Sequence, residues 1–127
     1  MKREKSQSKL RKEADKIFSL YIRKKYSDDF DRVVCYTCGK IFPSKQIQNG
    51  HFVKRQYLAT RYSEDNCRPQ CVGCNIFGDG KTVEFAKKLE EEKKGIVKKL
   101  YQEAQKIERN FDYQKIIDTY KEKIKSL

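Results

Sequence analysis

The chain has 127 residues, and its 30 Lys and Arg against 18 Asp and Glu give a formal net charge of +12 at pH 7. A chain of this length usually folds as one domain. The apolar content of 37% predicts a thin core, while eight Tyr and seven Phe argue against disorder. The basic excess favours polyanionic partners, in particular the phosphate backbone of nucleic acids, although a soluble lysine-rich surface would give the same count.

The sequence also argues against a membrane or secreted protein. No stretch has the roughly 20 apolar residues that cross a bilayer, and residues 1–14, MKREKSQSKLRKEA, lack the apolar core of a signal peptide. We therefore expect an intracellular protein with no membrane partner. In a reducing compartment, the five cysteines are expected to bind a metal and not to form a disulfide framework.

The first region, residues 1–30, is predicted to form a basic N-terminal helix. Over residues 8–26, apolar side chains recur at helical spacing with Lys and Arg between them. We expect the apolar face to pack against the rest of a single domain, residues 1–127. The apolar positions are Leu10, Ala14, Ile17, Phe18 and Tyr21.

The middle region, residues 31–81, contains all five cysteines and is predicted to form a compact core with short strands. Glycines and prolines interrupt any long helix there. The segments VVCYTCGKIF (33–42) and IQNGHFV (47–53) have the β-branched and aromatic content that is typical of strands.

The last region, residues 82–127, is predicted to form three helices. Thr82 is the expected cap of a helix that runs to Gly95, since glycine suits the left-handed position after a helix end. Asp112 is the expected cap of the last helix. The apolar stripes of the second and third helices favour core packing or a dimer contact over base stacking. These stripes are Ile96, Val97, Leu100, Ala104 and Ile107, then Tyr113, Ile116, Ile117, Tyr120, Ile124 and Leu127.

Two pairs of cysteines have the spacing of a zinc site. Cys35 and Cys38 form one CxxC pair, and Cys71 and Cys74 form the second. Zn²⁺ takes four thiolates in a tetrahedron, and each CxxC turn supplies two of them. The sequence therefore predicts a closed structural zinc site at these four residues.

Two other residues could complete such a site. Cys67 could replace one of the four cysteines, but its wider spacing from Cys71 favours a small buried apolar residue. His51, the only histidine of the chain, could also be a ligand. With four thiolates available zinc does not need it, which leaves the imidazole free for another role.

The order of the motifs resembles that of the HNH, or ββα-metal, endonucleases. A CxxC pair is followed by Gly-His, by an isolated Asn, and by a second CxxC pair with Asn directly after it. The three letters of the motif would be His51, Asn66 and Asn75. The resemblance implies an α+β fold, with a small zinc-bound treble-clef core flanked by N-terminal and C-terminal amphipathic helices.

A second resemblance, from about residue 10 to the C-terminus, rests on the segments ADKIFSLYIRKK, CYTCGK, GHFVKR, TRYSEDN, QCVGCN and IIDTYKEKIKSL. These segments are similar to those of the NinG/Rap family of phage recombination nucleases. That family is associated with endonuclease activity on branched double-stranded DNA, including Holliday junctions. The resemblance implies a structure-selective, divalent-metal-dependent endonuclease in the cytoplasm of a bacterial host.

Phosphodiester hydrolysis needs a base for water and a cation on the phosphate oxygens. A neutral imidazole suits the first task, so His51 is the expected general base. By resemblance, Asn75 gives a side-chain oxygen to a catalytic Mg²⁺ or Mn²⁺, since hard cations prefer oxygen ligands. Asn66 is expected to orient His51 or to brace the loop between the strands.

Gly50 stands where many enzymes of this superfamily have Asp or His as a second metal ligand. Asp79, Asp65 or Glu64 could substitute, or the ion would keep more of its water. If the metal site is defective, the chain is instead a non-catalytic zinc module that binds nucleic acid.

Lys54, Arg55 and Arg61 lie close to His51 in the sequence and are expected to bind the DNA backbone, because guanidinium groups pair bidentately with phosphate. A solvated basic face is the alternative. Nothing resembles a helix that reads bases, so we expect recognition by shape and charge.

Paired incision of a four-way junction needs two active sites, which a homodimer built by the terminal helices would supply. The charge of +12 disfavours a zinc scaffold that contacts only proteins.

Overall fold

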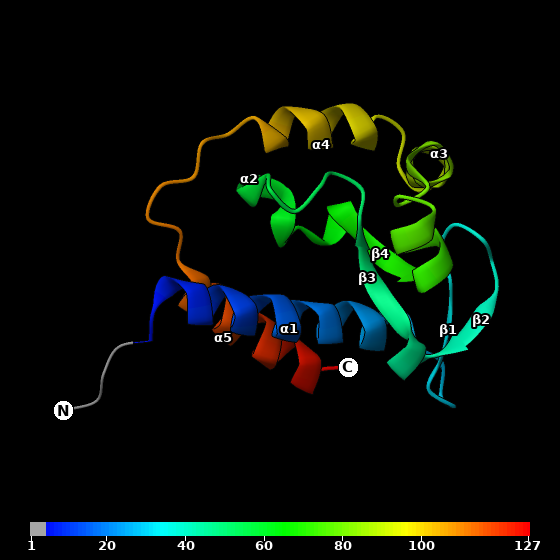
Figure 1. Ribbon diagram of the computed structural model, residues 1–127, viewed down its shortest axis with the longest axis horizontal. Coiled ribbons are helices and arrows are strands. Elements are labelled where there is room, and N and C mark those ends of the chain that lie inside the picture. The colour runs from blue at the N-terminus through cyan, green and yellow to red at the C-terminus, as the bar shows by residue number, and fades with distance from the viewer. Residues whose placement is uncertain (1–4) are drawn as a thin grey trace.

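The computed structural model describes residues 5–127, so residues 1–4, the start of the predicted basic N-terminal helix region, lie outside the described residues. Helices α1 (Gln7–Lys25) and α5 (Tyr113–Lys125) lie side by side along one side of the molecule (Figure 1). The opposite side holds α3 (Thr82–Glu92) and α4 (Ile96–Ala104). Short strands and the one-turn helix α2 (Leu58–Arg61) lie between these two helical layers.

The strands form two antiparallel two-stranded sheets. β1 (Arg32–Val34) pairs with β2 (Ile41–Pro43), and β3 (Ile47–His51) pairs with β4 (Cys67–Cys71). The first sheet lies at the end of the molecule beyond the second sheet (Figure 1). The mixture of helices and short strands confirms the α+β composition expected from the sequence.

β4 is a strand that the sequence analysis did not predict. All five of its residues are buried, and it contains Pro69, which has no N–H to donate. A two-stranded sheet has only edge strands, where proline is tolerated. The carbonyl of Pro69 still accepts a hydrogen bond from the amide of Tyr36 at 2.9 Å, which ties β4 to the turn after β1.

The core is divided into three small clusters. One joins α1 and α5, one joins the loop after β3 with α3 and α4, and one surrounds the cysteines. This division bears out the thin core expected from the apolar content. The buried residues of the α1–α5 cluster are Ala14, Phe18, Tyr21, Ile22, Tyr62, Cys67, Ile117 and Tyr120. Those of the cluster with α3 and α4 are Phe52, Val53, Phe85, Leu89, Ile96, Leu100 and Ala104. Those of the cluster around the cysteines are Val33, Cys35, Ile47, Cys71 and Cys74.

The apolar stripes of the terminal helices face each other within one chain. Ile117 and Tyr120 of α5 are buried, and the ring of Tyr120 lies 4.7 Å from that of Phe18 in α1. Of the two uses that the sequence allowed, the structure shows core packing. The homodimer stays a prediction, and it would need a surface other than these stripes.

The ends of the helices test the predicted caps. α1 agrees with the helix expected over residues 8–26, and the side chain of Asp112 caps α5 by accepting from the amide of Lys115 at 3.0 Å. The cap predicted at Thr82 is wrong by one residue. Lys81 holds the N-cap position in a left-handed conformation, with φ of 48°, directly after Gly80, whose amide donates to the carbonyl of Cys74 at 2.9 Å.

The helix after Thr82 is also shorter than expected. α3 ends at Glu92, ahead of the predicted stop at Gly95. Gly95 does adopt the left-handed conformation, with φ of 89°, but as the residue that begins α4. The carboxylate of Glu90 explains the early end, since it accepts from the amides of Gly95 and Val97 at 2.7 and 3.0 Å.

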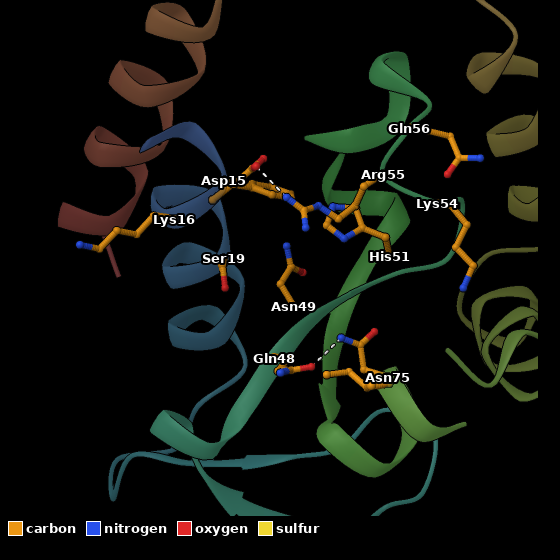
Figure 2. Close-up of a pocket in the computed structure, with 12 residues that line it drawn as sticks. Asp15, Lys16, Ser19, Gln48, Asn49, His51, Lys54, Arg55, Gln56 and Asn75 are labelled. Atoms are coloured by element: carbon orange, nitrogen blue, oxygen red, sulfur yellow. Dashed lines mark hydrogen bonds and ion pairs between the residues drawn. The ribbon is translucent and has the colours of Figure 1, made fainter. Parts of the chain in front are cut away.

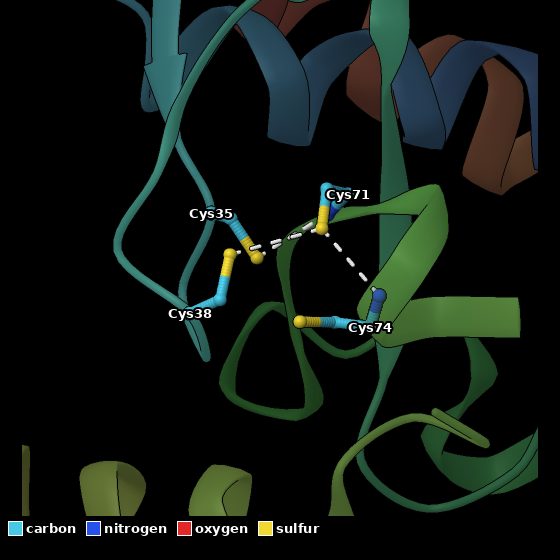
Figure 3. Close-up of side chains that lie close together, drawn as sticks. All are labelled: Cys35, Cys38, Cys71 and Cys74. Atoms are coloured by element: carbon cyan, nitrogen blue, oxygen red, sulfur yellow. Dashed lines mark hydrogen bonds between the residues drawn. The ribbon is translucent and has the colours of Figure 1, made fainter. Parts of the chain in front are cut away.

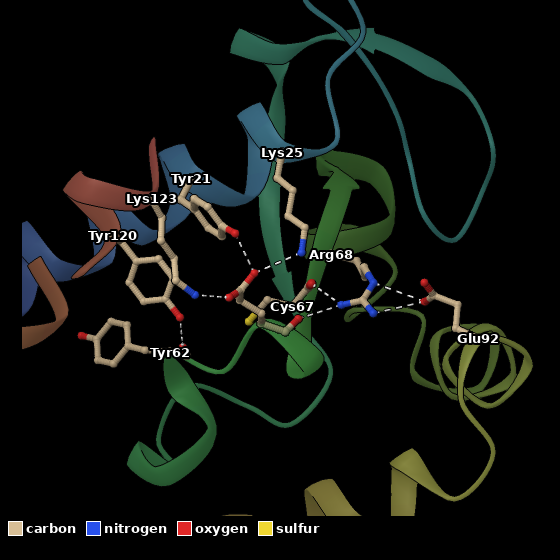
Figure 4. Close-up of polar contacts among 9 residues, drawn as sticks. Tyr21, Lys25, Tyr62, Cys67, Arg68, Glu92, Tyr120 and Lys123 are labelled. Atoms are coloured by element: carbon tan, nitrogen blue, oxygen red, sulfur yellow. Dashed lines mark hydrogen bonds and ion pairs between the residues drawn. The ribbon is translucent and has the colours of Figure 1, made fainter. Parts of the chain in front are cut away.

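Glu64 joins the helical layer to the turn before β4. Its carboxylate accepts hydrogen bonds from Tyr21 Oη at 2.7 Å, from Lys25 Nζ at 3.0 Å and from Lys123 Nζ at 2.7 Å (Figure 4). Burial works to raise the pKa of Glu64, but these donors outweigh it and lower the pKa to about 2. One carboxylate therefore links α1, α5 and the segment that leads into β4.

Replacing Glu64 by Gln should lower the free energy of unfolding at pH 7 by about 1–3 kcal/mol, because hydrogen bonds to a charged acceptor are lost. The folded pKa lies below the ordinary value of 4.5, so the contribution of Glu64 is complete above that pH and is lost as the pH falls toward 2. Urea denaturation at several pH values should show the difference between wild type and variant shrinking over this range.

Glu122→Gln is the control for this measurement. Glu122 is exposed, and its one ion pair within residues 5–127 is with Lys125, at 3.8 Å, so its replacement should change the stability little. A difference between wild type and Glu64→Gln that stays constant from pH 7 to pH 2.5 would contradict the role given to Glu64.

Candidate active site and metal centre

Four cysteine sulfurs lie together where β4 meets the turn between β1 and β2 (Figure 3). Cys35 and Cys38 come from that turn, Cys71 ends β4, and Cys74 lies in the π-helical turn η3 (Gly73–Phe77). The four sulfurs lie within 4.8 Å of one another, and those of Cys38 and Cys71 are 3.8 Å apart. Tetrahedral Zn²⁺ with bonds of about 2.3 Å places its sulfurs about 3.8 Å apart. The cluster therefore fits a structural zinc ion.

Backbone amides point at these sulfurs. The amide of Cys71 donates to Cys35 Sγ at 3.3 Å, and the amide of Cys74 donates to Cys71 Sγ at 3.4 Å. Burial works to raise the pKa of Cys35, but amide donors lower it to about 6. Within residues 5–127 this is the single cluster of three or more potential metal ligands among His, Cys, Asp and Glu.

Cys67 lies outside the cluster. It is fully buried in the core formed with α1 and α5, and burial raises the pKa of its thiol well above the usual value. A protonated thiol in an apolar environment is inert as a ligand. This is the environment of the small apolar residue that the sequence analysis favoured for Cys67.

A second site is a cavity of about 680 Å³ beside β3 (Figure 2). His51 lines it from the end of β3, and Asn75 lines it from the π-helical turn. Gln48 and Asn49 of β3 line the wall between them, and α1 forms the far side. The structure thus brings together His51 and Asn75, two of the three residues of the proposed motif.

The hydrogen bond of His51 determines which ring nitrogen can accept a proton. His51 Nε2 lies 2.8 Å from the carbonyl oxygen of Arg61. A carbonyl oxygen only accepts, so Nε2 carries the proton and Nδ1 keeps its lone pair. Burial lowers the pKa of His51 to about 4, and the nearby Arg55 and Arg61 add to this effect, so the imidazole is neutral at pH 7. A neutral imidazole with one free lone pair is the form that a general base requires.

Asn75 has one half of its amide engaged. Its Nδ2 donates to Gln48 Oε1 at 2.8 Å, which leaves Oδ1 available to a ligand (Figure 2). Gln48 is a cavity residue that the sequence analysis missed. Its only sequence signal is its place three residues before His51 on the same predicted strand.

Asn66 does not line the cavity but braces the loop that follows His51. It is fully buried, and its Oδ1 accepts from the amide of Val53 at 2.7 Å. Its Nδ2 donates to the carbonyls of Val53 and Thr60 at 3.0 and 3.1 Å. Of the two roles expected for Asn66, these contacts match the bracing of the loop.

Asp15 of α1 holds two of the three predicted DNA-binding residues. Arg61 makes a bidentate pair with it, at 3.0 and 2.6 Å, and the Arg61 side chain is only 14% exposed. Arg55 reaches the same carboxylate at 2.7 Å but remains 57% exposed. Burial works to raise the pKa of Asp15, but hydrogen bonds from Arg61 and Tyr62 hold it below its usual value. Arg61 is therefore a structural cation, whereas Lys54 and Arg55 are accessible at the cavity.

The structure gives a steric reason for Gly50 before His51. A side chain at position 50 would collide with the amide of Gln70, which is fully buried and donates from Nε2 to the carbonyl of Gly80 at 2.8 Å. The carboxylate expected at this position would therefore require the buried Gln70 side chain to move and to give up its hydrogen bond to Gly80.

Of the acidic residues considered as substitutes, none lines the cavity. Glu64 is engaged by Lys25 and Lys123, and Asp79 is 98% exposed beside Lys54. Asp15 is the acidic residue that does line it, and the sequence analysis missed it. It lies 36 residues before His51 on another helix, so no local pattern connects the two.

The whole sequence matches one known protein family. The family model described as Bacteriophage Lambda NinG protein matches residues 1–127. The chain belongs to the NinG family. Neither the curated proteins nor the solved structures contain a match. Membership in the NinG family confirms the resemblance noted from the sequence and indicates a function related to phage recombination.

The length and apolar content of the helices also bear on whether they could span a membrane. None of the helices within residues 5–127 of this NinG-family chain combines the length and the apolar content that crossing a bilayer requires.

Replacing Cys71 by Ala should abolish binding of one zinc ion per chain and should unfold residues 35–75 first, since a structural zinc contributes on the order of 10 kcal/mol to small domains. Metal content by atomic absorption and circular dichroism would measure both effects. Cys67→Ala is the matched control, because it removes a buried thiol outside the cluster and should keep the zinc. Equal metal content in the two variants would contradict the assignment.

Proposed function

We propose that the chain is a divalent-metal-dependent endonuclease that cuts branched double-stranded DNA, such as Holliday junctions, with little sequence specificity. The observation that carries the proposal is one basic cavity lined by both a neutral imidazole, His51, and an amide oxygen donor, Asn75. Membership in the NinG family supports the link to recombination.

The arrangement of elements supports a ββα-metal core on a treble-clef zinc site. The Cys35–Cys38 turn precedes the antiparallel pair β3 and β4; Cys71 ends β4, and Cys74 lies in the π-helical turn that comes next. His51 is at the end of the first strand of this pair and Asn75 is in the helical turn after the second. As zinc ligands, Cys71 and Cys74 would thereby fix the position of Asn75, which directly follows Cys74.

In the proposed reaction, the phosphate of the scissile bond enters the cavity between α1 and the π-helical turn. His51 Nδ1 accepts a proton from a water molecule as the water oxygen bonds to phosphorus. The bond from phosphorus to the leaving oxygen breaks, and that oxygen takes a proton from solvent. The backbone carbonyl of Arg61 holds the imidazole of His51 in place, and Asn66 holds the loop that joins His51 to Arg61.

Asn75 Oδ1 would hold Mg²⁺ or Mn²⁺, with the DNA phosphate and water as its other ligands. When bound, such an ion neutralises charge on the phosphate oxygens and on the leaving group. The donor set fits a hard cation, since amide oxygen and water suit it, and Mg²⁺ is often held by few protein groups. Gln48 keeps the Asn75 amide turned so that its oxygen is free.

Lys54 and Arg55 would bind the DNA backbone beside this centre. Lys54 is 47% exposed, and Arg55 can exchange one oxygen of Asp15 for a phosphate oxygen while Arg61 keeps Asp15 neutralised. Paired incision of a four-way junction further requires two copies of the chain, on a surface other than the α1–α5 contact.

A second candidate function is a non-catalytic zinc module that binds nucleic acid. It is favoured by one observation: the cysteine cluster is the one multi-ligand metal site found among residues 5–127. The same basic surface would serve this function, and only cleavage separates the two.

The test uses a four-way junction and a linear duplex with the same arm sequences, each incubated with zinc-loaded protein in Mg²⁺, in Mn²⁺ or with neither ion added. Wild type should nick the junction in both metals and not in their absence. His51→Ala should reduce nicking by about 100-fold or more, the usual contribution of a general base. Asn75→Ala should raise the concentration of Mn²⁺ that half-maximal nicking requires.

Gln102→Ala, an exposed amide on α4 outside the cavity, is the control and should nick as wild type does. Circular dichroism and zinc content establish that each variant is folded. Tight, salt-dependent binding of the junction without nicking in any metal would reject the nuclease and favour the binding module.

A further inference from the structure

The tip of the π-helical turn exposes apolar side chains beside the candidate active site. Phe77 is 85% exposed, and Ile76, which lines the cavity together with Asn75, is 58% exposed. Single exposed apolar residues are common on protein surfaces. Two in succession, directly after a candidate metal ligand, are positioned to touch whatever enters the cavity.

The backbone around this tip is fixed by hydrogen bonds. The amide of Gly78 donates to the carbonyl of Gly73 at 2.7 Å, and the amide of Gly80 donates to the carbonyl of Cys74 at 2.9 Å. A side chain at Gly78 would come within 2.9 Å of that same Cys74 oxygen, so the turn is tightly closed. Because Cys74 belongs to the cysteine cluster, the turn that carries the exposed Phe77 is anchored at that cluster.

Positive side chains flank the tip. Lys54 Nζ donates to the carbonyl of Asp79 at 3.1 Å, two residues after Phe77. Lys81 lies against Gly78, since a Cβ there would come within 2.7 Å of its Cε. A polyanion bound to these ammonium groups is brought against an exposed aromatic ring. Nucleic acid combines the two features required, because its backbone is anionic and each base has a flat face that stacks on aromatic side chains.

We propose that Phe77 stacks on an unstacked nucleobase at a DNA branch point, with Ile76 beside it, and that this contact selects branched over linear DNA. The inference rests on the proposed function in its choice of DNA as the substrate. Bases inside a continuous duplex are covered on both faces, and exposing one is easiest where pairing is interrupted. Apolar side chains that insert between base steps hold DNA in such open conformations. Phe77 is thus a specificity-determining residue.

The test measures binding to a four-way junction with 2-aminopurine at the branch point and to a linear duplex of the same sequence. Binding is measured in Ca²⁺, so that it is independent of cleavage. Phe77→Ala should bind the junction about 5- to 100-fold more weakly, the loss expected for one base-stacking contact, and should bind the duplex within about twofold of wild type. It should also lose the fluorescence change that wild type produces. Phe77→Trp should retain both properties.

Phe30→Ala is the matched control. Phe30 is also exposed, at 78%, but it lies in the turn before β1 and does not line the cavity. Equal junction affinity and equal fluorescence for Phe77→Ala and Phe30→Ala would overturn the proposal and indicate that the tip contacts something other than a base. Failure of wild type to bind the junction would overturn it too.

Nicking in Mn²⁺ is measured separately, so that the two proposals can fail independently. A wild type that binds, changes the fluorescence through Phe77 and never nicks would support stacking and reject the nuclease. A wild type that nicks, but whose junction affinity and fluorescence change are matched by Phe77→Ala, would support the nuclease and overturn stacking.

Discussion

The four-cysteine cluster is the constraint on which the rest of the molecule depends. It joins the turn after β1 to the end of β4, and the sulfurs of Cys38 and Cys71 come from positions 33 residues apart. The apolar cluster around it has only five buried residues, three of them the ligands Cys35, Cys71 and Cys74. So small a core gives the two short sheets little apolar packing. A zinc ion bound to the four cysteines would do for this end of the molecule what packed side chains do for α1 and α5.

The same cluster sets the geometry of the cavity. Asn75 follows Cys74 directly, so a zinc ion bound at the cluster would fix where the Asn75 amide oxygen lies relative to His51 on β3. On the opposite wall, Asp15 neutralises Arg61 and leaves the Arg61 carbonyl to orient the imidazole. The two arginines beside Asp15 therefore differ: Arg61 is mostly buried in its ion pair, whereas Arg55 stays exposed at the cavity, where it could bind phosphate in the proposed reaction.

The features that the sequence predicted are those with local patterns. The four clustered cysteines have fixed spacing, α1 has a helical apolar period, and Asp112 is followed by apolar residues at helical spacing. The features it missed depend on contacts between distant segments. The sequence of β4 contains a proline and the potential metal ligand Cys71, and it has no strand pattern of its own. It is a strand because it pairs with β3. Asp15 and Gln48 join the cavity only through tertiary packing. Thr82 failed as a cap because the turn at Lys81 is set by the cysteine site and not by the capping residue.

The central claim is that the zinc cluster places His51 and Asn75 at one divalent cation, and paramagnetic broadening by Mn²⁺ tests it most directly. His51 is the only histidine, so its ring protons give an assigned signal in the NMR spectrum of the zinc-loaded protein. Substoichiometric Mn²⁺ should broaden this signal in wild type, and Asn75→Ala should keep it sharp. A signal that stays sharp in wild type, or that broadens equally in Asn75→Ala, would contradict the claim.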